Sequence, residues 1–167
     1  NESDLLLDAV MEAIAVGELA KVPVEISHLK ACPARNWGLS KVALELITRG
    51  RLKGVDVTCD VYPYTASMTS LIAALPPWAR EGGIEKTMSL IKNYASRKKI
   101  IENLGRPSLE WENMVYDVGM DEIILAYSEN YKSFEGKSIS KIANELGKDP
   151  YEAILNIIEA DGLSAMV

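Results

Sequence analysis

Two groups of polar side chains in this sequence have the types and spacing of residues that handle small molecules. His28, the only histidine, is followed two positions later by Lys30, and Asp60 precedes two closely spaced tyrosines, Tyr62 and Tyr64. An imidazole can bind a metal ion, an ammonium can pair with an anion, and phenol hydroxyls can hydrogen-bond a carboxylate. If both groups enter one cleft, they predict a site for a small, negatively charged ligand.

Each group also has a simpler structural explanation. A single histidine at the end of a strand is more often a hydrogen-bonded structural residue than a ligand. Asp60 shares the parity of Asp56 and Thr58, so the three could instead form a half-solvated strand face. The residues alone leave both explanations open.

Two further motifs are set aside. Gly136-Lys137-Ser138 resembles the end of a phosphate-binding loop, but Tyr131 stands where that loop needs its first glycine. Cys32 and Cys59 form no CxxC pair and lie far apart in the sequence, so they predict two buried thiols rather than a disulfide framework or a zinc knuckle.

Alternating helices and strands would position the candidate residues. The predicted order is a helix over Asp4–Leu19, a strand over Val22–Ile26, a helix over about Ser40–Arg49 with Ser40 as its N-cap, and a strand over Val55–Val61. Such alternation favours an α/β fold with a mostly parallel sheet. Strand parity places His28 on the face of Val24 and Ile26, at the carboxyl end of the strand, where α/β proteins build their sites.

The second half of the chain predicts helices and short strands. Two Lys-rich helices, Ile84–Asn93 and Ser96–Leu104, indicate an inserted surface flap within residues 76–120. Met114–Val118, Ile123–Tyr127 and Ser164–Val167 are predicted as short strands. A helical hairpin over Ser138–Ala160 is the clearest pattern, because Gly147 suits the end of one helix and Asp149-Pro150 suits the start of the next.

Composition narrows the class of protein. The 167 residues are 48% hydrophobic and 25% charged, as in ordinary globular domains. Lys plus Arg number 18 against 24 Asp plus Glu, which gives a net charge of −6. We therefore do not expect this protein to bind nucleic acid. No apolar stretch reaches the length of a membrane span and the first residues are acidic, so we expect a soluble, cytoplasmic protein without membrane partners.

Several segments together carry a family resemblance. They are Val24–Ala31, Asn36-Trp37-Gly38, Asp56–Ser67, Phe134–Ile139 and Ile142–Leu155. In combination these segments resemble the N-acyl-D-amino-acid deacylases, or D-aminoacylases, of the amidohydrolase superfamily. The resemblance is good over residues 1 to about 70 and about 125 to 167, and only loose over about 76 to 120.

The resemblance implies a zinc-dependent (β/α)8 barrel of the TIM type that hydrolyses the acyl amide bond of N-acyl-D-amino acids through a metal-bound hydroxide. It implies that His28 is a metal ligand, that Lys30 binds substrate, and that Tyr62 and Tyr64 lie near the substrate carboxylate. The family often has a serine after Ala-Gly, whereas this chain reads Ala66–Thr69 with the hydroxyl displaced, which leaves the particular acyl-amino acid undetermined.

The resemblance also implies that residues 1–167 are one fragment of a catalytic domain. The family's HxH pair, its bridging cysteine and its first strand-end histidine would precede Asn1, and its catalytic aspartate would follow Val167. No catalytic residue is therefore assigned within the chain. We expect the chain alone to be inactive and to bind zinc poorly, because a catalytic zinc needs about three protein ligands.

Two alternatives stay open from the sequence. One is a cyclic amide hydrolase like dihydroorotase or hydantoinase, in which a carboxylated lysine would bridge the metals. The other is a non-catalytic α/β module that associates with itself, because a partial barrel leaves strand edges and apolar faces uncovered. On either the deacylase or the module hypothesis we expect a homo-oligomer.

Overall fold

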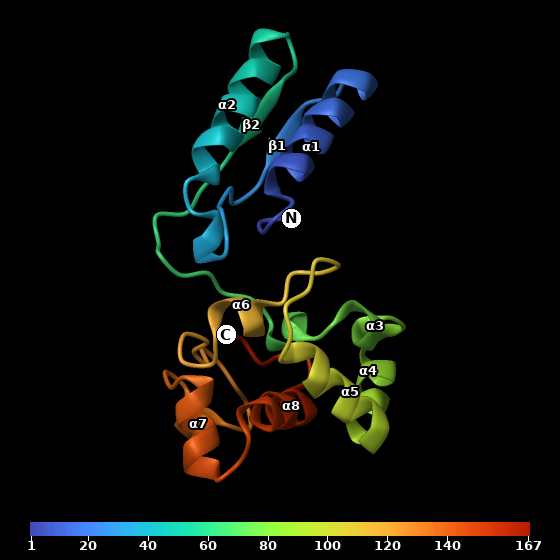
Figure 1. The fold of residues 1–167 in the computed structure, drawn as a ribbon, viewed down its shortest axis with the longest axis vertical. Helices are drawn as coiled ribbons and strands as arrows, with labels where there is room; N and C mark the ends of the chain where they lie inside the picture. The colour runs from blue at the N-terminus through green and yellow to red at the C-terminus, as the bar shows by residue number, and fades with distance from the viewer. The chain divides into compact units, whose positions relative to one another are not determined.

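The computed structural model describes residues Asn1–Val167, which form two compact units (Figure 1). Unit 1 comprises Asn1–Thr65 and unit 2 comprises Ala66–Val167. None of the helices combines the length and the apolar character needed to cross a membrane.

Unit 1 alternates helices and strands as the sequence predicts. In order it contains α1 (Leu6–Ala20), β1 (Val24–Ile26), the short 3-10 helix η1 (Ala34–Asn36), α2 (Leu39–Leu52) and β2 (Val57–Cys59). The two strands are parallel, with Val24 opposite Val57 and Ile26 opposite Cys59. The predicted mixed α/β class and parallel pairing are confirmed, although both strands are shorter than predicted.

One face of this strand pair carries the core of unit 1. Helices α1 and α2 pack beside each other (Figure 1) and contribute the buried Leu6, Val10, Ala43 and Ile47, which meet Val57 from β2. Gly17 lets α1 approach the sheet, because a Cβ at that position would lie 2.8 Å from Val24 Cγ2. The opposite face is polar.

That polar face is formed by the alternate residues of the two strands. Glu25 and Thr58 are exposed, and the Thr58 hydroxyl donates a hydrogen bond to the Glu25 carboxylate. The period of two in the sequence thus separates an apolar face under the helices from a hydrophilic face.

The prediction of Ser40 as an N-cap is wrong. Gly38 is the residue before α2, with φ +98°, and the helix begins at Leu39. Glycine adopts this left-handed conformation without steric cost, so the chain turns into the helix at Gly38. Ser40 consequently lies inside the first helical turn, where it cannot act as the cap.

Unit 2 is mostly helical. Its elements are η2 (Leu71–Ala74), α3 (Pro77–Arg80), α4 (Gly83–Lys92), α5 (Tyr94–Leu104), α6 (Met114–Val118), η3 (Lys132–Phe134), α7 (Ile139–Leu146) and α8 (Pro150–Asp161). The helices predicted within 84–93 and 96–104 are confirmed as α4 and α5.

The predicted helical hairpin is confirmed as α7 and α8. The Ser138 side chain accepts a hydrogen bond from the Lys141 N–H at the start of α7, and Gly147 ends that helix with φ +62°. The Asp149 side chain accepts bonds from the N–H groups of Tyr151 and Glu152 at the start of α8. Local capping chemistry explains why this part could be predicted well.

The prediction of a strand over Met114–Val118 is wrong, because these residues form α6. The Asn113 side chain caps the helix by accepting a bond from the Tyr116 N–H. Its Nδ2 group also donates to the main-chain oxygens of Asn103, Leu104 and Arg106, within 3.1 Å in each case. This buried amide imposes a helix start that the short apolar pattern did not reveal.

The other two predicted strands are only partly formed. Ile124 pairs with Ser138, and Tyr127 pairs with Met166, each as an isolated antiparallel bridge. Met166 also pairs with Ser70. The segments are extended where the sequence predicts, but none of them builds a continuous strand.

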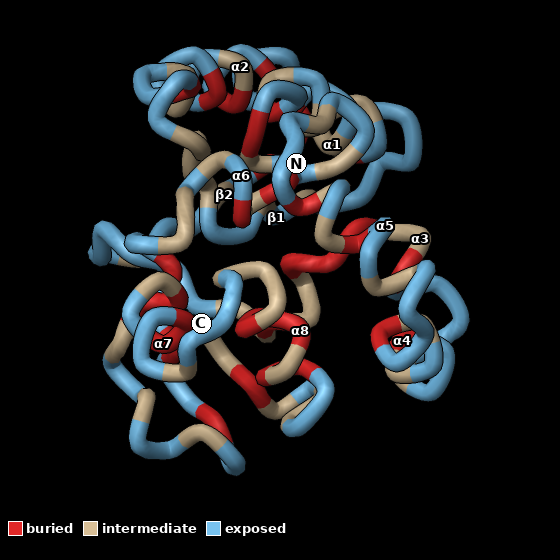
Figure 2. The backbone as a smooth tube through the Cα atoms, turned by 60° about the horizontal axis from the view of Figure 1, so that its bottom comes forward, coloured by how far each residue is buried: buried red, intermediate tan, exposed pale blue.

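Unit 2 has its own core, centred on α8. This helix buries Ala153, Ile154, Leu155, Ile157 and Ile158, visible as buried stretches in Figure 2. The segment 76–120 contributes buried side chains to the same core, namely Ala79, Ile91, Ile100, Leu104 and Val115. Its helices therefore belong to the folded body of unit 2.

The largely buried guanidinium of Arg97 joins α5 to α8. Arg97, whose side chain is 16% exposed, pairs with Glu152 at 2.7 Å and with Glu159 at 3.3 Å. It also donates to Asn156 Oδ1 at 2.9 Å and to the Ile91 carbonyl at 3.2 Å. These contacts satisfy the planar donor set of arginine along one face of α8.

Asp161, the last residue of α8, anchors the loop that follows the extended segment at 123–127. Its carboxylate accepts hydrogen bonds from the Ser128 hydroxyl, from the Asn130 side chain and from the N–H groups of Glu129 and Asn130. Burial raises the pKa of Asp161, but these hydrogen bonds outweigh it and hold the pKa below its ordinary value of 3.8.

We expect Asp161→Asn to be less stable than the wild type at pH 7 and to approach it in acid. Because the folded-state pKa is lowered, the carboxylate stabilises the fold above its unfolded-state pKa, and this contribution is lost as pH falls through the folded-state pKa. Urea unfolding at pH 7 and at about pH 3 measures the difference. The exposed Glu122→Gln serves as the control, and an equal deficit at both pH values would contradict the prediction.

Candidate functional site

The carboxyl ends of β1 and β2 are tied together at His28 and Asp60. The His28 N–H donates a hydrogen bond to the Asp60 carboxylate. The main chain adds two more bonds, from the Leu29 N–H to the Asp60 oxygen at 2.9 Å and from the Asp60 N–H to the Ile26 oxygen at 3.2 Å. The sheet edge therefore holds the segment that carries His28.

His28 does not lie on the strand face of Val24 and Ile26, where the alternation of the sequence predicts it. It lies in a turn after β1 with φ +45°, a left-handed conformation that costs a residue with a side chain about 1–2 kcal/mol. This reversal ends the alternation along β1, and the imidazole is 56% exposed. The Asp60 carboxylate and the main-chain bonds compensate for the unfavourable backbone conformation.

Three charged or titratable side chains meet at this turn, and we call them the charged cluster: Glu2, His28 and Lys30. Lys30 Nζ lies 2.7 Å from Glu2 Oε2, 3.0 Å from His28 Nδ1 and 3.2 Å from the His28 main-chain oxygen. His28 Nδ1 lies 3.6 Å from Glu2 Oε1. The predicted proximity of the imidazole and the ammonium is thus present in the structure.

The two tyrosines lie differently with respect to this cluster. The Tyr62 ring faces Lys30, with Nζ 5.5 Å from the ring centroid, a cation–π distance. Tyr64 is 76% exposed and makes no hydrogen bond or ring contact with His28 or Lys30. The structure therefore brings together four of the five residues singled out in the sequence, namely His28, Lys30, Asp60 and Tyr62.

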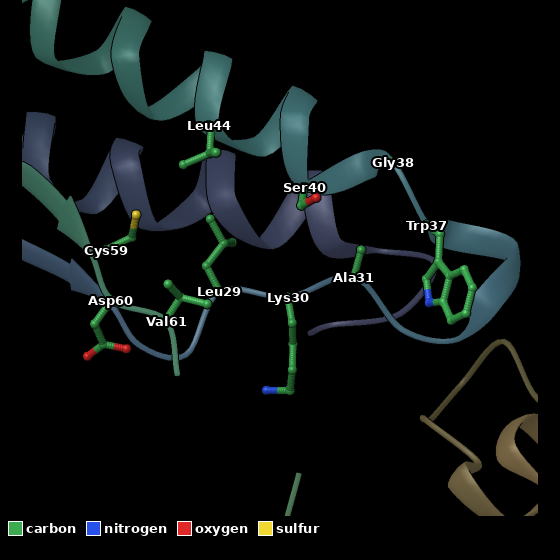
Figure 3. A pocket seen from close by; sticks show the side chains of 10 residues that line it. All are labelled: Leu29, Lys30, Ala31, Trp37, Gly38, Ser40, Leu44, Cys59, Asp60 and Val61. Atoms are coloured by element: carbon green, nitrogen blue, oxygen red, sulfur yellow. The ribbon is translucent and has the colours of Figure 1, made fainter. Parts of the chain in front are cut away.

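A pocket of about 400 Å³ opens beside the cluster. It is lined by Leu29, Lys30, Ala31, Trp37, Gly38, Ser40, Leu44, Cys59, Asp60 and Val61. Leu29, Leu44 and Val61 form an apolar wall, whereas the Lys30 ammonium and the Asp60 carboxylate point away from Leu44 (Figure 3). The pocket thus combines an apolar interior with charged groups at one side.

A second polar network fixes the loop between β1 and α2, which carries Lys30. Arg35 pairs with the Asp4 carboxylate through Nε at 2.9 Å and Nη2 at 3.0 Å. Asn36 Nδ2 donates to Asp4 Oδ1 at 2.9 Å and to the Cys32 oxygen at 2.8 Å. Hydrogen bonds from Arg35 and then Asn36 lower the pKa of Asp4.

The donor atoms of this chain fit one metal ligand but not a complete metal site. No group of three His, Cys, Asp or Glu side chains lies close enough together to hold an ion. The carboxylate that faces the His28 ring, that of Glu2, is already paired with Lys30. Since a catalytic zinc needs about three protein ligands, His28 can serve as one of them only if others come from outside these residues.

Glu2 is the site residue that sequence reasoning missed. It stands far from His28 and Lys30 in the sequence, and a single carboxylate before a helix carries no distinguishing pattern. A main-chain hydrogen bond holds Glu2 beside His28 and Lys30, because the Cys32 N–H donates to the Glu2 main-chain oxygen at 2.7 Å. This proximity depends on the folded loop and is not visible in the sequence.

Comparison with known proteins gives two curated relatives, whereas no protein-family model matches the chain. Over 72 residues it is 44% identical to an N-acyl-D-glutamate deacylase of Alcaligenes xylosoxydans xylosoxydans, covering 43% of this chain and 15% of that protein. Over 71 residues it is 37% identical to a D-aminoacylase of the same organism, covering 42% of this chain and 14% of that protein. The chain thus matches only a small part of these relatives' length.

Solved structures match nearly the whole chain. A crystal structure of N-acyl-D-glutamate deacylase from Bordetella bronchiseptica, in complex with zinc and a phosphonate inhibitor, matches 99% of this chain and 26% of its own, with a TM-score of 0.65 and 24% identity. A crystal structure of D-aminoacylase, described as defining a novel subset of amidohydrolases, matches 99% of this chain and 25% of its own, with a TM-score of 0.60 and 22% identity. A D-aminoacylase variant in complex with copper gives 0.59.

These neighbours define a class first: they are metal-dependent amidohydrolases, and the chain shares their fold over the matched part. More particularly, the curated relatives are an N-acyl-D-glutamate deacylase and a D-aminoacylase. The resemblance to D-aminoacylases in the sequence is thereby confirmed.

Proposed function

We propose that this chain is part of the catalytic domain of a zinc-dependent amidohydrolase built on a (β/α)8 barrel. The parallel order β1, α2, β2, with both helices on one face, is the repeating unit of such a barrel. In the proposal the polar face with Glu25 and Thr58 is turned toward the barrel interior. Residues 76–120 form an insertion whose helices pack into unit 2.

The proposed activity is hydrolysis of the acyl amide bond of N-acyl-D-amino acids. The observation that carries it is the 3.0 Å approach of Lys30 Nζ to His28 Nδ1 at the carboxyl ends of parallel strands. A metal-ligand imidazole beside an ammonium matches a substrate that presents an amide carbonyl and a carboxylate on the same small molecule. The activities of the two relatives, an N-acyl-D-glutamate deacylase and a D-aminoacylase, support the same substrate class.

Each site residue then has a distinct role. His28 would supply one ligand to a zinc ion, and the bound ion would lower the pKa of its water towards neutral and polarise the amide carbonyl. Lys30 pairs with the substrate carboxylate, Tyr62 contacts the ammonium through its ring, and Tyr64 contributes a hydroxyl from the solvent-exposed side of the cleft. The apolar wall of Leu29, Leu44 and Val61 lines the pocket beside them.

The partners in this proposal are a small-molecule N-acyl amino acid and a second copy of the protein. The net charge of −6 disfavours binding to nucleic acid. A cytoplasmic location belongs to the same proposal. Static light scattering of the full-length protein tests the oligomer, and a monomer at high concentration would contradict that part.

The test of function is an assay of the full-length protein with a panel of N-acyl-D-amino acids, in which the released amino acid is detected by a coupled D-amino-acid oxidase. We expect turnover that is lost on chelation and restored by zinc. Activity that survives exhaustive chelation would contradict the proposal. Turnover restricted to cyclic imides would instead support the dihydroorotase- or hydantoinase-like alternative.

We expect Lys30→Ala in the full-length enzyme to raise KM by about tenfold while leaving kcat nearly unchanged. An ammonium that pairs with the substrate carboxylate contributes to binding, and losing a charge-assisted hydrogen bond costs about 1.5–3 kcal/mol. Steady-state kinetics separates the two constants. Lys53→Ala, at an exposed position after α2, is the control, and a selective loss of kcat would contradict the assignment.

A further inference from the structure

Glu2 reaches the charged cluster from a segment that is itself held in place. The Asn1 side chain accepts hydrogen bonds from the N–H groups of Ser3 at 3.0 Å and Leu5 at 3.2 Å. The Glu2 main-chain oxygen accepts a bond from the Cys32 N–H at 2.7 Å. The Glu2 carboxylate is therefore presented from an anchored main chain, and its side chain is 33% exposed.

The contacts of Lys30 account for its whole donor set. An ammonium has three N–H donors. Three acceptors surround Nζ: Glu2 Oε2 at 2.7 Å, His28 Nδ1 at 3.0 Å and the His28 main-chain oxygen at 3.2 Å. Glu2 makes the shortest of the three contacts and the only one between full charges, so it determines where the ammonium lies.

Glu2 also faces the His28 ring on the same nitrogen as Lys30. When Nδ1 lacks a hydrogen, it accepts from Lys30; when Nδ1 carries one, Glu2 Oε1 at 3.6 Å is the nearby carboxylate. The 3.0 Å contact requires Nδ1 to accept, because an ammonium can only donate, so Lys30 and the Glu2 carboxylate favour opposite tautomers of the ring. In the tautomer with hydrogen on Nδ1, which leaves the Nε2 lone pair available, Lys30 gives up its contact with Nδ1 and regains one donor.

The geometry points to Glu2 as a positioning residue that holds the Lys30 ammonium beside His28 and so orders it in advance for the substrate carboxylate. The inference rests on the substrate-binding role proposed for Lys30. The Lys30 N–H that is released from His28 Nδ1 donates to the substrate carboxylate, while another Lys30 N–H continues to donate to the Glu2 carboxylate.

Two effects of Glu2 on substrate binding oppose each other. Its negative charge repels the substrate carboxylate, whereas its ion pair removes the rotamer freedom that Lys30 would otherwise lose on binding. The Glu2 and Lys30 side chains are 33% and 21% exposed, so water weakens the repulsion. The direct contact at 2.7 Å keeps the ordering effect, which therefore dominates.

Kinetics of the full-length enzyme tests the ordering. Glu2→Ala is expected to raise KM for an accepted N-acetyl-D-amino acid by about tenfold, with kcat changed less than about twofold. Glu2→Gln keeps an oxygen that accepts from Lys30 and should restore part of the loss. The matching N-acetyl-D-amino acid amide, which has no carboxylate, should show no such change in KM. An unchanged or lower KM in Glu2→Ala would overturn the inference.

A second measurement does not depend on activity. His28 is the only histidine in the chain, so its Nδ1 and Nε2 resonances make up the whole imidazole signal of residues 1–167 in ¹⁵N NMR. In Glu2→Ala that signal should shift toward the tautomer with hydrogen on Nε2, and Glu12→Ala, at an exposed position of α1, should leave it unchanged. A signal that does not respond to Glu2→Ala would overturn the inference.

The two experiments separate this inference from the proposed function. A full-length protein without deacylase activity, combined with a shifted His28 signal in Glu2→Ala, would overturn the function but support the contact that orders Lys30. An active enzyme in which neither KM nor the His28 signal responds to Glu2→Ala would overturn the role of Glu2 alone.

Discussion

Replacing His28 by alanine in the full-length protein is expected to abolish zinc retention and to lower kcat/KM by about a thousandfold. Metal assistance contributes several kcal/mol to amide hydrolysis, and each 1.36 kcal/mol corresponds to a factor of ten in rate. His28 is the single histidine of the chain and lies at the carboxyl end of β1. Elemental analysis of the purified protein and steady-state kinetics measure the two effects.

The control for this prediction is His28→Gly, which suits the left-handed backbone conformation at this position. His28 has φ +45°, which glycine adopts without steric cost, so His28→Gly should fold at least as stably as His28→Ala. Both variants should nevertheless lack zinc. If His28→Gly or His28→Ala retained the wild-type zinc content, the ligand assignment would be wrong.

Leu155→Ala is expected to destabilise unit 2 by about 2–5 kcal/mol, the usual range for a leucine truncated in a packed core. Leu155 is completely buried in α8, among side chains from α4, α5 and α7 that include Ile91, Ile100 and Ile142. This loss is a large part of the roughly 5–15 kcal/mol that stabilises a typical domain. Calorimetry should show a lower unfolding temperature for the transition of unit 2.

A matched leucine in the same unit provides the control. Leu163 follows α8 and is 60% exposed, so Leu163→Ala should change the free energy of unfolding by no more than about 0.5 kcal/mol. Equal effects of the two substitutions would contradict the placement of the core around α8.

Local patterns in the sequence determined the elements whose causes are themselves local. The hairpin of α7 and α8 follows from Ser138, Gly147 and Asp149, each of which acts on main-chain groups within a few residues. The parallel pairing of β1 and β2 follows from the alternation of strand and helix, because a helix must return the chain in the same direction.

The errors lie where a distant contact overrides the local pattern. Met114–Val118 has the short apolar character of a strand, yet the Asn113 amide, bonded to the end of α5, starts a helix there. Ser40 looks like a cap, yet the left-handed turn at Gly38 starts α2 earlier. Neither the partner of an amide nor the sign of a backbone angle is expressed in the periodicity of hydrophobic residues.

The candidate site divides along the same line. The sequence by itself determined which residue types were available, a single imidazole with an ammonium two positions later, and the family that their surroundings resemble. Only the tertiary structure decided that His28 turns out of the strand, that Tyr62 rather than Tyr64 meets Lys30, and that Glu2 joins the cluster. The reason is physical: these contacts depend on a left-handed turn bonded to Asp60 and on a loop bonded to Asp4, and both bonds join residues about 30 positions apart.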